Sequence, residues 1–328
     1  FNWRARVSQS EIAARLKARM RLPAVVAPMF LVSGPQLVAA ARAAGLMASF
    51  PFPNARTIDV LEEWLAATHA DNARAPFAAN MVTHSTYGRF DAELDLVKQY
   101  RPDAVITALG GPGRVVDAVH DYGGLVFADV NNVKFARKAI EQGADGLVLV
   151  AAGAGGHTGT MSSFAFVTAV REFFDGPVML GGAISNGRAV RAAEVLGADF
   201  AYMGTRFIAA GESLADAEYR DMLIAAEFED LVLSDKLTGA PAHYLRASLE
   251  KMGIGTDGSR GSGPDFADSE NQVKAWRDVW SAGHGVGSVK RTQPVAEIVD
   301  ELAAEYAAAC ATPVHDTNMQ TTAAALAG

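Results

Sequence analysis

The chain has 328 residues, half of them hydrophobic and a fifth charged, so it can bury a large core in one big domain or in a barrel with an appendage. Its formal net charge of -8 and its scattered lysines and arginines argue against a nucleic-acid partner, which needs a basic face, so we expect a small-molecule partner. The single cysteine, Cys310, excludes a disulfide framework and a cysteine-based metal cluster within the chain, which favours a reducing compartment such as the cytoplasm.

The first predicted element is an amphipathic helix close to the N-terminus. Ile12, Leu16 and Met20 recur at helical spacing, and Glu11 stands among the basic residues, which favours an ordinary helix over a transit segment. No apolar run in the chain reaches the ~18 residues of a membrane-spanning helix, so we expect no association with a membrane.

Eight short apolar runs follow, each separated from the next by a segment of helical period. Their near-continuous Val, Leu, Ile and Ala content indicates strands that are buried on both faces, as in a parallel sheet covered by helices. Eight such units in about 200 residues predict a closed (β/α)8 TIM barrel, although an open doubly wound sheet would show the same alternation. The predicted strands are residues 24–28, 46–50, 77–80, 104–107, 125–129, 146–150, 178–181 and 200–204.

The regular alternation ends after Phe207. The next segment is mostly helical in pattern, and we interpret it as a lid inserted behind the barrel. A later amphipathic segment, from Val295 to Ala309, is expected to return to the barrel wall, and the small polar residues after it are typical of a tail without a core. The predicted parts are a barrel (1–212), a helical lid (213–284), a returning segment (285–310) and a tail (311–328).

Glycines and a threonine stand where the last two predicted strands end. In barrel enzymes the carboxyl ends of the strands carry the chemistry, and the loops after strands seven and eight often hold a phosphate. Gly181 and Gly182 end the seventh strand, and Gly204 and Thr205 end the eighth. Glycine N–H groups can approach an anion closely, so these loops predict a phosphate site. A tight turn without a ligand would explain either pair alone.

A histidine follows the sixth strand, in the run Ala154–His157. The imidazole of His157 titrates near neutrality and can act as an acid or a base in a cleft, and the two glycines before it let a flat ring such as a flavin approach the backbone. We predict that His157 is catalytic, with a structural histidine as the alternative. His284, in a glycine-rich run, is a second candidate, whereas His243 is expected to be an ordinary residue of the lid.

Two further residues end predicted strands at the same rim. Asn80 follows strand three, and Met29 follows strand one after Pro28. The amide of Asn80 and the exposed backbone at Met29 can each donate to and accept from the edge of a heterocycle. A turn-capping asparagine and a packing methionine are the alternatives.

Together these motifs resemble the nitronate monooxygenases, formerly called 2-nitropropane dioxygenases. The barrel of that family is also similar to the FMN-dependent enoyl-thioester reductases of bacterial fatty-acid synthesis. The set is specific for this superfamily because the pieces occur in order over nearly the whole chain, but it is less specific for the reaction. The matching pieces are residues 27–29, Asn80, 143–145, 154–157, 181–184, 197–199, 203–207 and 282–287.

The resemblance implies one bound FMN and a catalytic role for His157. In the family a nitronate is oxidised with O2 to a carbonyl compound and nitrite, and His157 would accept the α-proton of a nitroalkane or donate a hydrogen bond to a nitronate. The implied FMN-binding residues are Ala27, Pro28, Met29, Asn80, Asp129, Gly155 and Gly156 around the ring and Gly181, Gly182, Gly204 and Thr205 at the phosphate.

Three positions depart from the family pattern. Gly153 stands where many relatives have an acidic residue, Asp129 where they have a basic or neutral one, and His284 where they have glutamine. A carboxylate at residue 129 would oppose an anionic reduced flavin or else bond a ring N–H. The leading hypothesis is oxidation of small alkyl nitronates. An NAD(P)H-dependent enoyl-thioester reductase and a flavin-binding protein without turnover stay open, as does a homodimer.

Overall fold

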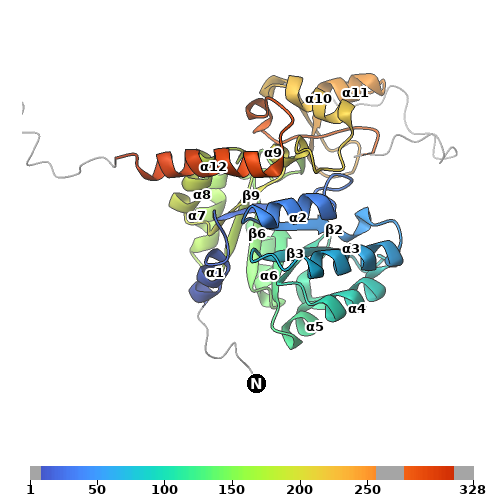
Figure 1. Ribbon diagram of the computed structural model, residues 1–328, viewed down its shortest axis with the longest axis vertical. Helices are drawn as coiled ribbons and strands as arrows, with labels where there is room; N and C mark the ends of the chain where they lie inside the picture. Colours follow the sequence, from blue (N-terminus) through green and yellow to red (C-terminus); the bar gives the residue numbers. More distant parts are fainter. Residues whose placement is uncertain (1–8, 256–276, 314–328) are drawn as a thin grey trace, which may run out of the picture.

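The computed structural model describes residues 9–255 and 277–313, and its main body is a barrel (Figure 1). The barrel strands are β1 (Ala24–Val26), β2 (Met47–Pro51), β3 (Phe77–Val82), β4 (Ala104–Ala108), β5 (Leu125–Val130), β6 (Gly146–Val150), β8 (Val178–Gly181) and β9 (Phe200–Met203). Each strand pairs in parallel with the next, and β9 pairs with β1, so the sheet is closed. The predicted (β/α)8 barrel is confirmed, and the open sheet is excluded.

Helices alternate with the strands and cover the outside of the barrel. Several begin at a side chain that accepts a backbone N–H of the first turn, such as Thr57 before α3 and Asn186 before α8. Gly197 ends α8 with φ 107°, a conformation that favours glycine. The outer elements are α2 (Pro35–Ala43), η2 (Phe52–Asn54), α3 (Ile58–Ala70), α4 (Phe90–Tyr100), η3 (Pro112–Arg114), α5 (Val116–Asp121), α6 (Val133–Glu141), α7 (Ser163–Arg171), α8 (Gly187–Leu196) and α9 (Thr205–Ile208).

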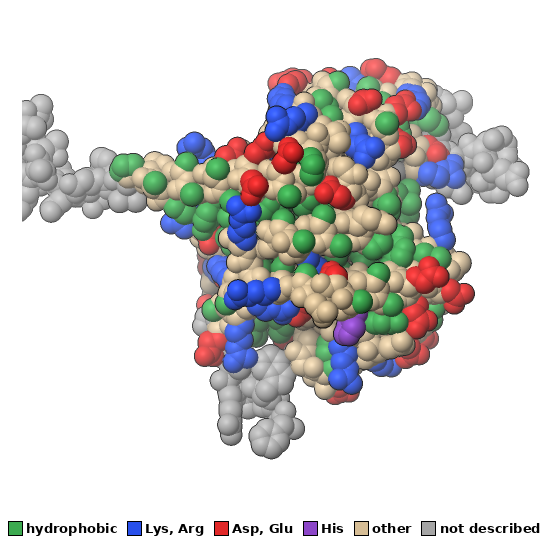
Figure 2. Space-filling model, viewed as in Figure 1, with side chains coloured by type: hydrophobic (Ala, Val, Ile, Leu, Met, Phe, Trp, Pro, Cys, Tyr) green, Lys and Arg blue, Asp and Glu red, His purple; other side chains and the backbone are tan. Residues whose placement is uncertain are grey.

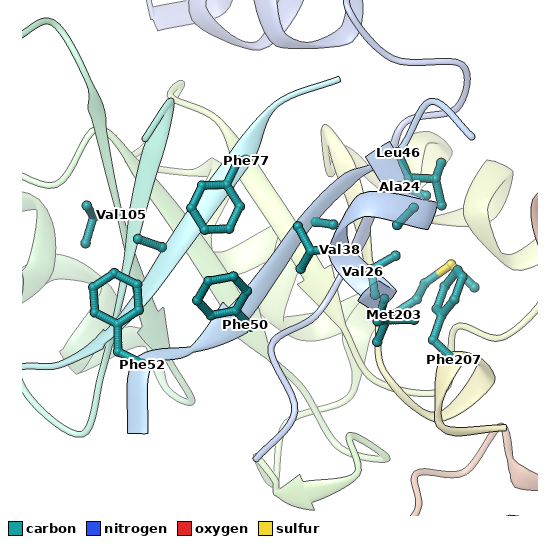
Figure 3. Packing of buried hydrophobic residues seen from close by; sticks show 14 of the residues in the cluster. Ala24, Val26, Val38, Leu46, Phe50, Phe52, Phe77, Val105, Met203 and Phe207 are labelled. Atoms are coloured by element: carbon teal, nitrogen blue, oxygen red, sulfur yellow. The ribbon is translucent and has the colours of Figure 1, made fainter. Parts of the chain in front are cut away.

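Both faces of the strands are buried, as their composition predicted. Side chains that point outward, such as Phe50, pack between the sheet and the helices, where Phe50 and Phe77 lie 5.2 Å apart between ring centroids (Figure 3). Side chains that point inward, such as Met47, Phe127 and Phe200, fill the barrel interior. The interior is therefore a packed core, so a ligand site is expected at an end of the barrel.

The helix α1 (Gln9–Lys17) covers the amino end of the barrel. Its Ile12, Ala13 and Leu16 are buried against the interior cluster, and its neighbours are the loops that lead into β4 and β5. A cavity of about 310 Å³ lies there too, lined by residues of α1 and those loops. It is at the opposite end of the strands from the predicted site.

We expect Leu16→Ala to lower the free energy of unfolding by about 2–4 kcal/mol, because it leaves a hole in a buried cluster. Urea titration would measure the change. The control is Val195→Ala, since Val195 is exposed on α8 and should lose very little stability. Equal losses in the two variants would show that α1 does not seal the barrel.

The C-terminal helix α12 (Val295–Cys310) returns to the barrel, as predicted, and lies along α8 and α2 (Figure 1). Val295, Ile298 and Leu302 join the outer core. A hydrogen bond also joins α12 to α8, since the Tyr306 hydroxyl donates to Glu194 at 2.6 Å. Most of the predicted tail, residues 314–328, lies outside the described residues.

The segment of residues 213–284, which we call the lid, contains a small sheet that the sequence analysis missed. The strands β10 (Leu231–Ser234) and β11 (Ala242–Leu245) form a hairpin, and β7 (Gly156–His157), from the loop after β6, pairs with β11. The helical pattern predicted for this segment is confirmed at α10 (Ala217–Ala225) and α11 (Arg246–Lys251), but the strands between them were missed, because four-residue strands carry almost no periodic signal. The other elements are η4 (Phe228–Asp230) and, just after the lid, η5 (Val286–Ser288). Residues 256–276 lie outside the described part.

Figure 1 shows α10 and α11 on the far side of the barrel from α1, so the lid lies towards the carboxyl ends of the strands. On the face seen in Figure 2, acidic and basic side chains are intermingled. Within residues 9–255 and 277–313, no helix is both long and apolar enough to cross a membrane.

Candidate active site

The loop after β1 carries Ala27, Pro28 and Met29 and is held in place by Asn54. The Asn54 amide donates to the carbonyl oxygens of Met29 at 3.0 Å and Ser33 at 2.7 Å, and its Oδ1 accepts the N–H of Leu31 at 2.8 Å. Asn54 is buried, so these bonds are shielded from water. Sequence reasoning missed this residue. Its signal was a polar side chain just after strand two, at the same end of the barrel.

The loops after β8 and β9 lie side by side because these strands are paired. Gly182 has φ 133°, and a Cβ there would lie 2.8 Å from the carbonyl oxygen of Ala152, so only glycine fits. A Cβ on Gly204 would lie 3.4 Å from Met29 Sδ, which places the loop after β9 beside the loop after β1. The predicted phosphate and ring residues therefore come from adjoining loops.

Thr205 is hydrogen-bonded in a way that leaves its hydroxyl able to donate. Its Oγ1 accepts the N–H of Gly283 at 2.8 Å. The hydroxyl hydrogen can then point to another acceptor, such as a phosphate oxygen. A Cβ on Gly155 would lie 2.7 Å from the same Gly283 nitrogen, so the loop after β6 is in close contact with residues 282–287.

Polar side chains line the carboxyl end of the barrel interior. Asn80 is buried and donates to the carbonyl oxygen of Ile106 at 3.1 Å. Among the buried polar atoms that have no hydrogen-bond partner within the described residues, three lie here, namely Ser49 Oγ, Asp129 Oδ1 and the Tyr202 hydroxyl. Each stands two residues after an interior side chain, so each points into the barrel. Buried groups of this kind need partners, which the polar edge of a flavin would provide.

Burial raises the pKa of Asp129 from 3.8 to about 7, and burial together with the nearby Asp129 raises the pKa of Tyr202 well above its ordinary value. A carboxyl group with such a pKa is protonated in a large fraction of molecules near neutrality. Asp129 can then donate a hydrogen bond as well as accept one.

The flavin-free Asp129→Asn variant is expected to keep its stability at high pH, where the parent loses it. The raised pKa favours the protonated carboxyl of Asp129 in the folded parent, so this stabilisation is fully present below about pH 4. As the pH rises through 7 the buried carboxyl ionises, and the free energy of unfolding of the parent falls by at most about 4 kcal/mol. Urea unfolding from pH 4 to pH 8 would compare the two proteins. Parallel pH dependence in parent and variant would show that Asp129 is not buried as described.

His157 lies in β7, at the edge of the lid sheet. Its cross-strand partner is Ala242, a residue of the lid core, and its Nε2 lies 3.0 Å from the hydroxyl oxygen of Thr238. Because that hydroxyl donates to the Ala240 carbonyl at 3.1 Å, it accepts from His157, which assigns the ring hydrogen to Nε2. Desolvation lowers the pKa of His157 below its ordinary value, which favours the neutral ring at pH 7.

His243 and His284 form a second imidazole site on the other face of the lid sheet. His243 pairs across the strands with Gly156 and is buried, contrary to its expected place as an ordinary lid residue. Its Nε2 lies 3.1 Å from Nε2 of His284. Burial lowers the pKa of both rings, and His243 lowers that of His284 further.

A family model for nitronate monooxygenases matches residues 57–253, more than half of the chain. The chain belongs to the nitronate monooxygenase family. It is therefore a flavin-dependent oxidoreductase, as the sequence predicted. A nitronate monooxygenase of Pseudomonas aeruginosa is 32% identical over 162 residues, 46% of this chain and 46% of that protein.

A second relative is named for a different activity. The (3aS,4S,5R,7aS)-5-hydroxy-7a-methyl-1-oxo-octahydro-1H-indene-4-carboxyl-CoA dehydrogenase of Rhodococcus jostii is 28% identical over 232 residues, 69% of this chain and 63% of that protein. The match therefore spans less than two thirds of this relative, as it does of the Pseudomonas aeruginosa protein.

Two solved structures share the fold over almost their full lengths. Nitroalkane oxidase from Streptomyces ansochromogenes superposes with a TM-score of 0.75 at 24% identity, covering 90% of this chain and 98% of that one. FabK from Thermotoga maritima also gives 0.75, at 21% identity, covering 92% and 96%. At these identities the likenesses establish the barrel and its lid, not the substrate.

Proposed function

We propose that the protein oxidises small alkyl nitronates with O2, yielding a carbonyl compound and nitrite, with FMN as its cofactor. The proposal is supported by the glycine loops and the unpartnered polar atoms at the carboxyl end of a nitronate monooxygenase barrel, and by the close approach of Gly155, in the loop that leads to His157, to Thr205 and Gly283. In net terms two nitronates and one O2 give two carbonyl compounds and two nitrite ions, so atoms and charge balance.

The described residues fit FMN. The backbone of Gly181, Gly182 and Gly204 and the hydroxyl of Thr205 would hold the phosphate, since a side chain is absent at three of these positions. Bound FMN would supply the two-electron redox chemistry and the reaction with O2. The ring edge would be held by the polar and backbone groups at the barrel mouth, which are Ala27, Pro28, Met29, Asn80, Asp129, Gly155 and Gly156.

His157 would accept the α-proton of the substrate. With its ring hydrogen on Nε2 and bonded to Thr238, the basic nitrogen of the neutral ring is Nδ1. Nδ1 could accept the α-proton of a neutral nitroalkane, and a lowered pKa keeps the ring in the accepting form at neutral pH. Once protonated, the ring could donate a hydrogen bond to the oxygens of the nitronate.

Reduction or oxidation of an acyl thioester is the second candidate, because the lid exposes apolar side chains beside His243 and His284. Phe228 meets His284 edge-on with ring centroids 4.8 Å apart, and Leu233 pairs across the strands with His243. Both side chains are more than half exposed. Such a surface suits a longer apolar substrate than a small nitronate, and the Rhodococcus jostii relative is named for a CoA thioester.

Oxygen consumption and nitrite release by the FMN-loaded protein would test the leading proposal. Ethyl and propyl nitronate should each be consumed with nitrite released at every turnover. A protein that consumes no O2 with any nitronate, but oxidises NAD(P)H when an enoyl thioester is added, would overturn the proposal in favour of the second candidate.

A further inference from the structure

Two histidines hold consecutive carbonyl groups of the loop that precedes His157. The Nδ1 atom of His243 lies 3.0 Å from the carbonyl oxygen of Ala154, and the backbone N–H of His284 donates to the carbonyl oxygen of Gly153 at 2.9 Å. The two rings then meet through their Nε2 atoms at 3.1 Å. Barrel loop, lid strand and the segment of residues 282–287 are thus joined by one chain of hydrogen bonds.

The hydrogen bonds fix the tautomer of each ring. A carbonyl oxygen can only accept, so Nδ1 of His243 carries a hydrogen and its Nε2, in the neutral ring, is an acceptor. His284 must then donate from Nε2. The pair therefore keeps its geometry when it is neutral, and it also keeps it when His284 takes a proton on Nδ1. Only a second proton, on His243 Nε2, breaks the contact.

Glycine at residue 153 makes room for this arrangement. Gly153 has φ 88°, and a Cβ there would lie 2.7 Å from Nδ1 of His284. No side chain fits at residue 153 while the imidazole is in place. Gly153 and His284 are therefore two parts of one local structure.

The groups around the pair are apolar or already neutralised. The Phe228 ring packs edge-on against His284. Glu227, just before it, contacts residues 282–287 at Gly287 and is ion-paired with Lys290 at 2.7 Å. Within residues 9–255 and 277–313, no carboxylate hydrogen-bonds either imidazole. The two rings satisfy each other without a charged partner.

We propose that His243 and His284 are positioning residues, which set the loop of residues 153–156 and thereby the place of His157 and of the backbone that faces the flavin. This rests on the proposed function in taking that loop to border the substrate. The side chains act through the bond from the His243 ring to the Ala154 carbonyl, which the His284 ring supports by donating to His243, while the backbone N–H of His284 bonds Gly153. A displacement of about 1 Å at a reacting group is enough to cost 10²-fold in rate, so loss of these bonds should be visible in kcat.

Two substitutions at residue 284 separate hydrogen bonding from packing. His284→Gln keeps an N–H that can donate to His243, whereas His284→Leu fills similar space without a donor. His284→Leu keeps the backbone bond to Gly153 but removes the donor that orients the His243 ring towards Ala154. We expect it to bind flavin but to lose about 10- to 100-fold in kcat with little change in KM, and His284→Gln to recover most of the loss. His69→Gln, on the outer helix α3, is the matched control and should behave as the parent.

Nitrogen-15 NMR of the histidine-labelled, flavin-loaded protein gives a readout that does not depend on activity. It should show His243 protonated on Nδ1 and His284 on Nε2, with the His157 signals shifted in His284→Leu and restored in His284→Gln. Other tautomers, or His157 signals that ignore both substitutions, would overturn the inference even if nitronates are oxidised. If the predicted tautomers and shifts appear but no nitronate is consumed, the proposed function fails and the positioning of the loop stands.

Discussion

Replacing His157 with glutamine is expected to lower kcat/KM for a neutral nitroalkane by about 10²- to 10⁴-fold, because a positioned general base contributes that much. Glutamine keeps an N–H that can bond Thr238 but has no atom that accepts a proton at neutral pH. Preformed nitronate has already lost its α-proton, so its oxidation should fall much less. Steady-state rates with both forms of one substrate would measure the difference.

The pH profile and a second variant act as controls for this result. The pKa of His157 is lowered, so kcat/KM for the nitroalkane should rise with pH to a plateau. The midpoint of this rise should lie below the pKa of an ordinary histidine. Thr238→Val removes the partner of Nε2 but leaves the base, and it should lose less activity than His157→Gln. Equal loss of activity with nitroalkane and nitronate in His157→Gln would contradict a role as base.

Replacing Gly204 with alanine is expected to weaken FMN binding about 100-fold, equivalent to about 2.7 kcal/mol, while leaving the fold intact. The backbone of Gly204 has φ -108°, which any residue adopts, and the added Cβ would meet Met29 Sδ only at 3.4 Å. The new methyl group would lie at the barrel mouth between the loops after β1 and β9, where we place the cofactor. Fluorescence titration of the flavin-free protein with FMN would give the affinity.

Gly88→Ala is the matched control, because a Cβ at Gly88 would have no atom within 4 Å. Urea unfolding of both flavin-free variants would show whether stability has changed. A Gly204→Ala variant that binds FMN as tightly as the parent would mean that the cofactor phosphate and ring lie elsewhere.

The barrel could be predicted from the sequence because its strands carry a strong signal. A run such as Gly146–Val150 is apolar throughout, since it is buried on both faces, and a glycine such as Gly197 marks the turn before the next strand. These are local features, so they can be seen without knowing which strands become neighbours. The place of the glycines and of Thr205 at one end of the barrel could be predicted from the strands, because the carboxyl ends of parallel strands all lie at the same end.

The hairpin and its histidines could not be predicted in the same way. The strand β11 has four residues and takes its register from β10 and from β7, which lies about 85 residues earlier in the chain. His243 therefore gave no signal of its own, and its contact with His284 depends on folding of the lid. Asn54 was missed for a similar reason, since its partners Met29 and Ser33 lie in the preceding unit.

Anaerobic mixing of the FMN-loaded protein with ethyl nitronate tests the central claim most directly. The flavin absorbance should bleach with the nitronate alone, within the time of one turnover, and should recover when O2 is admitted, with nitrite in the solution. A flavin that keeps its colour with every nitronate, but is bleached by NAD(P)H and recovers its colour on adding an enoyl thioester, would contradict the account.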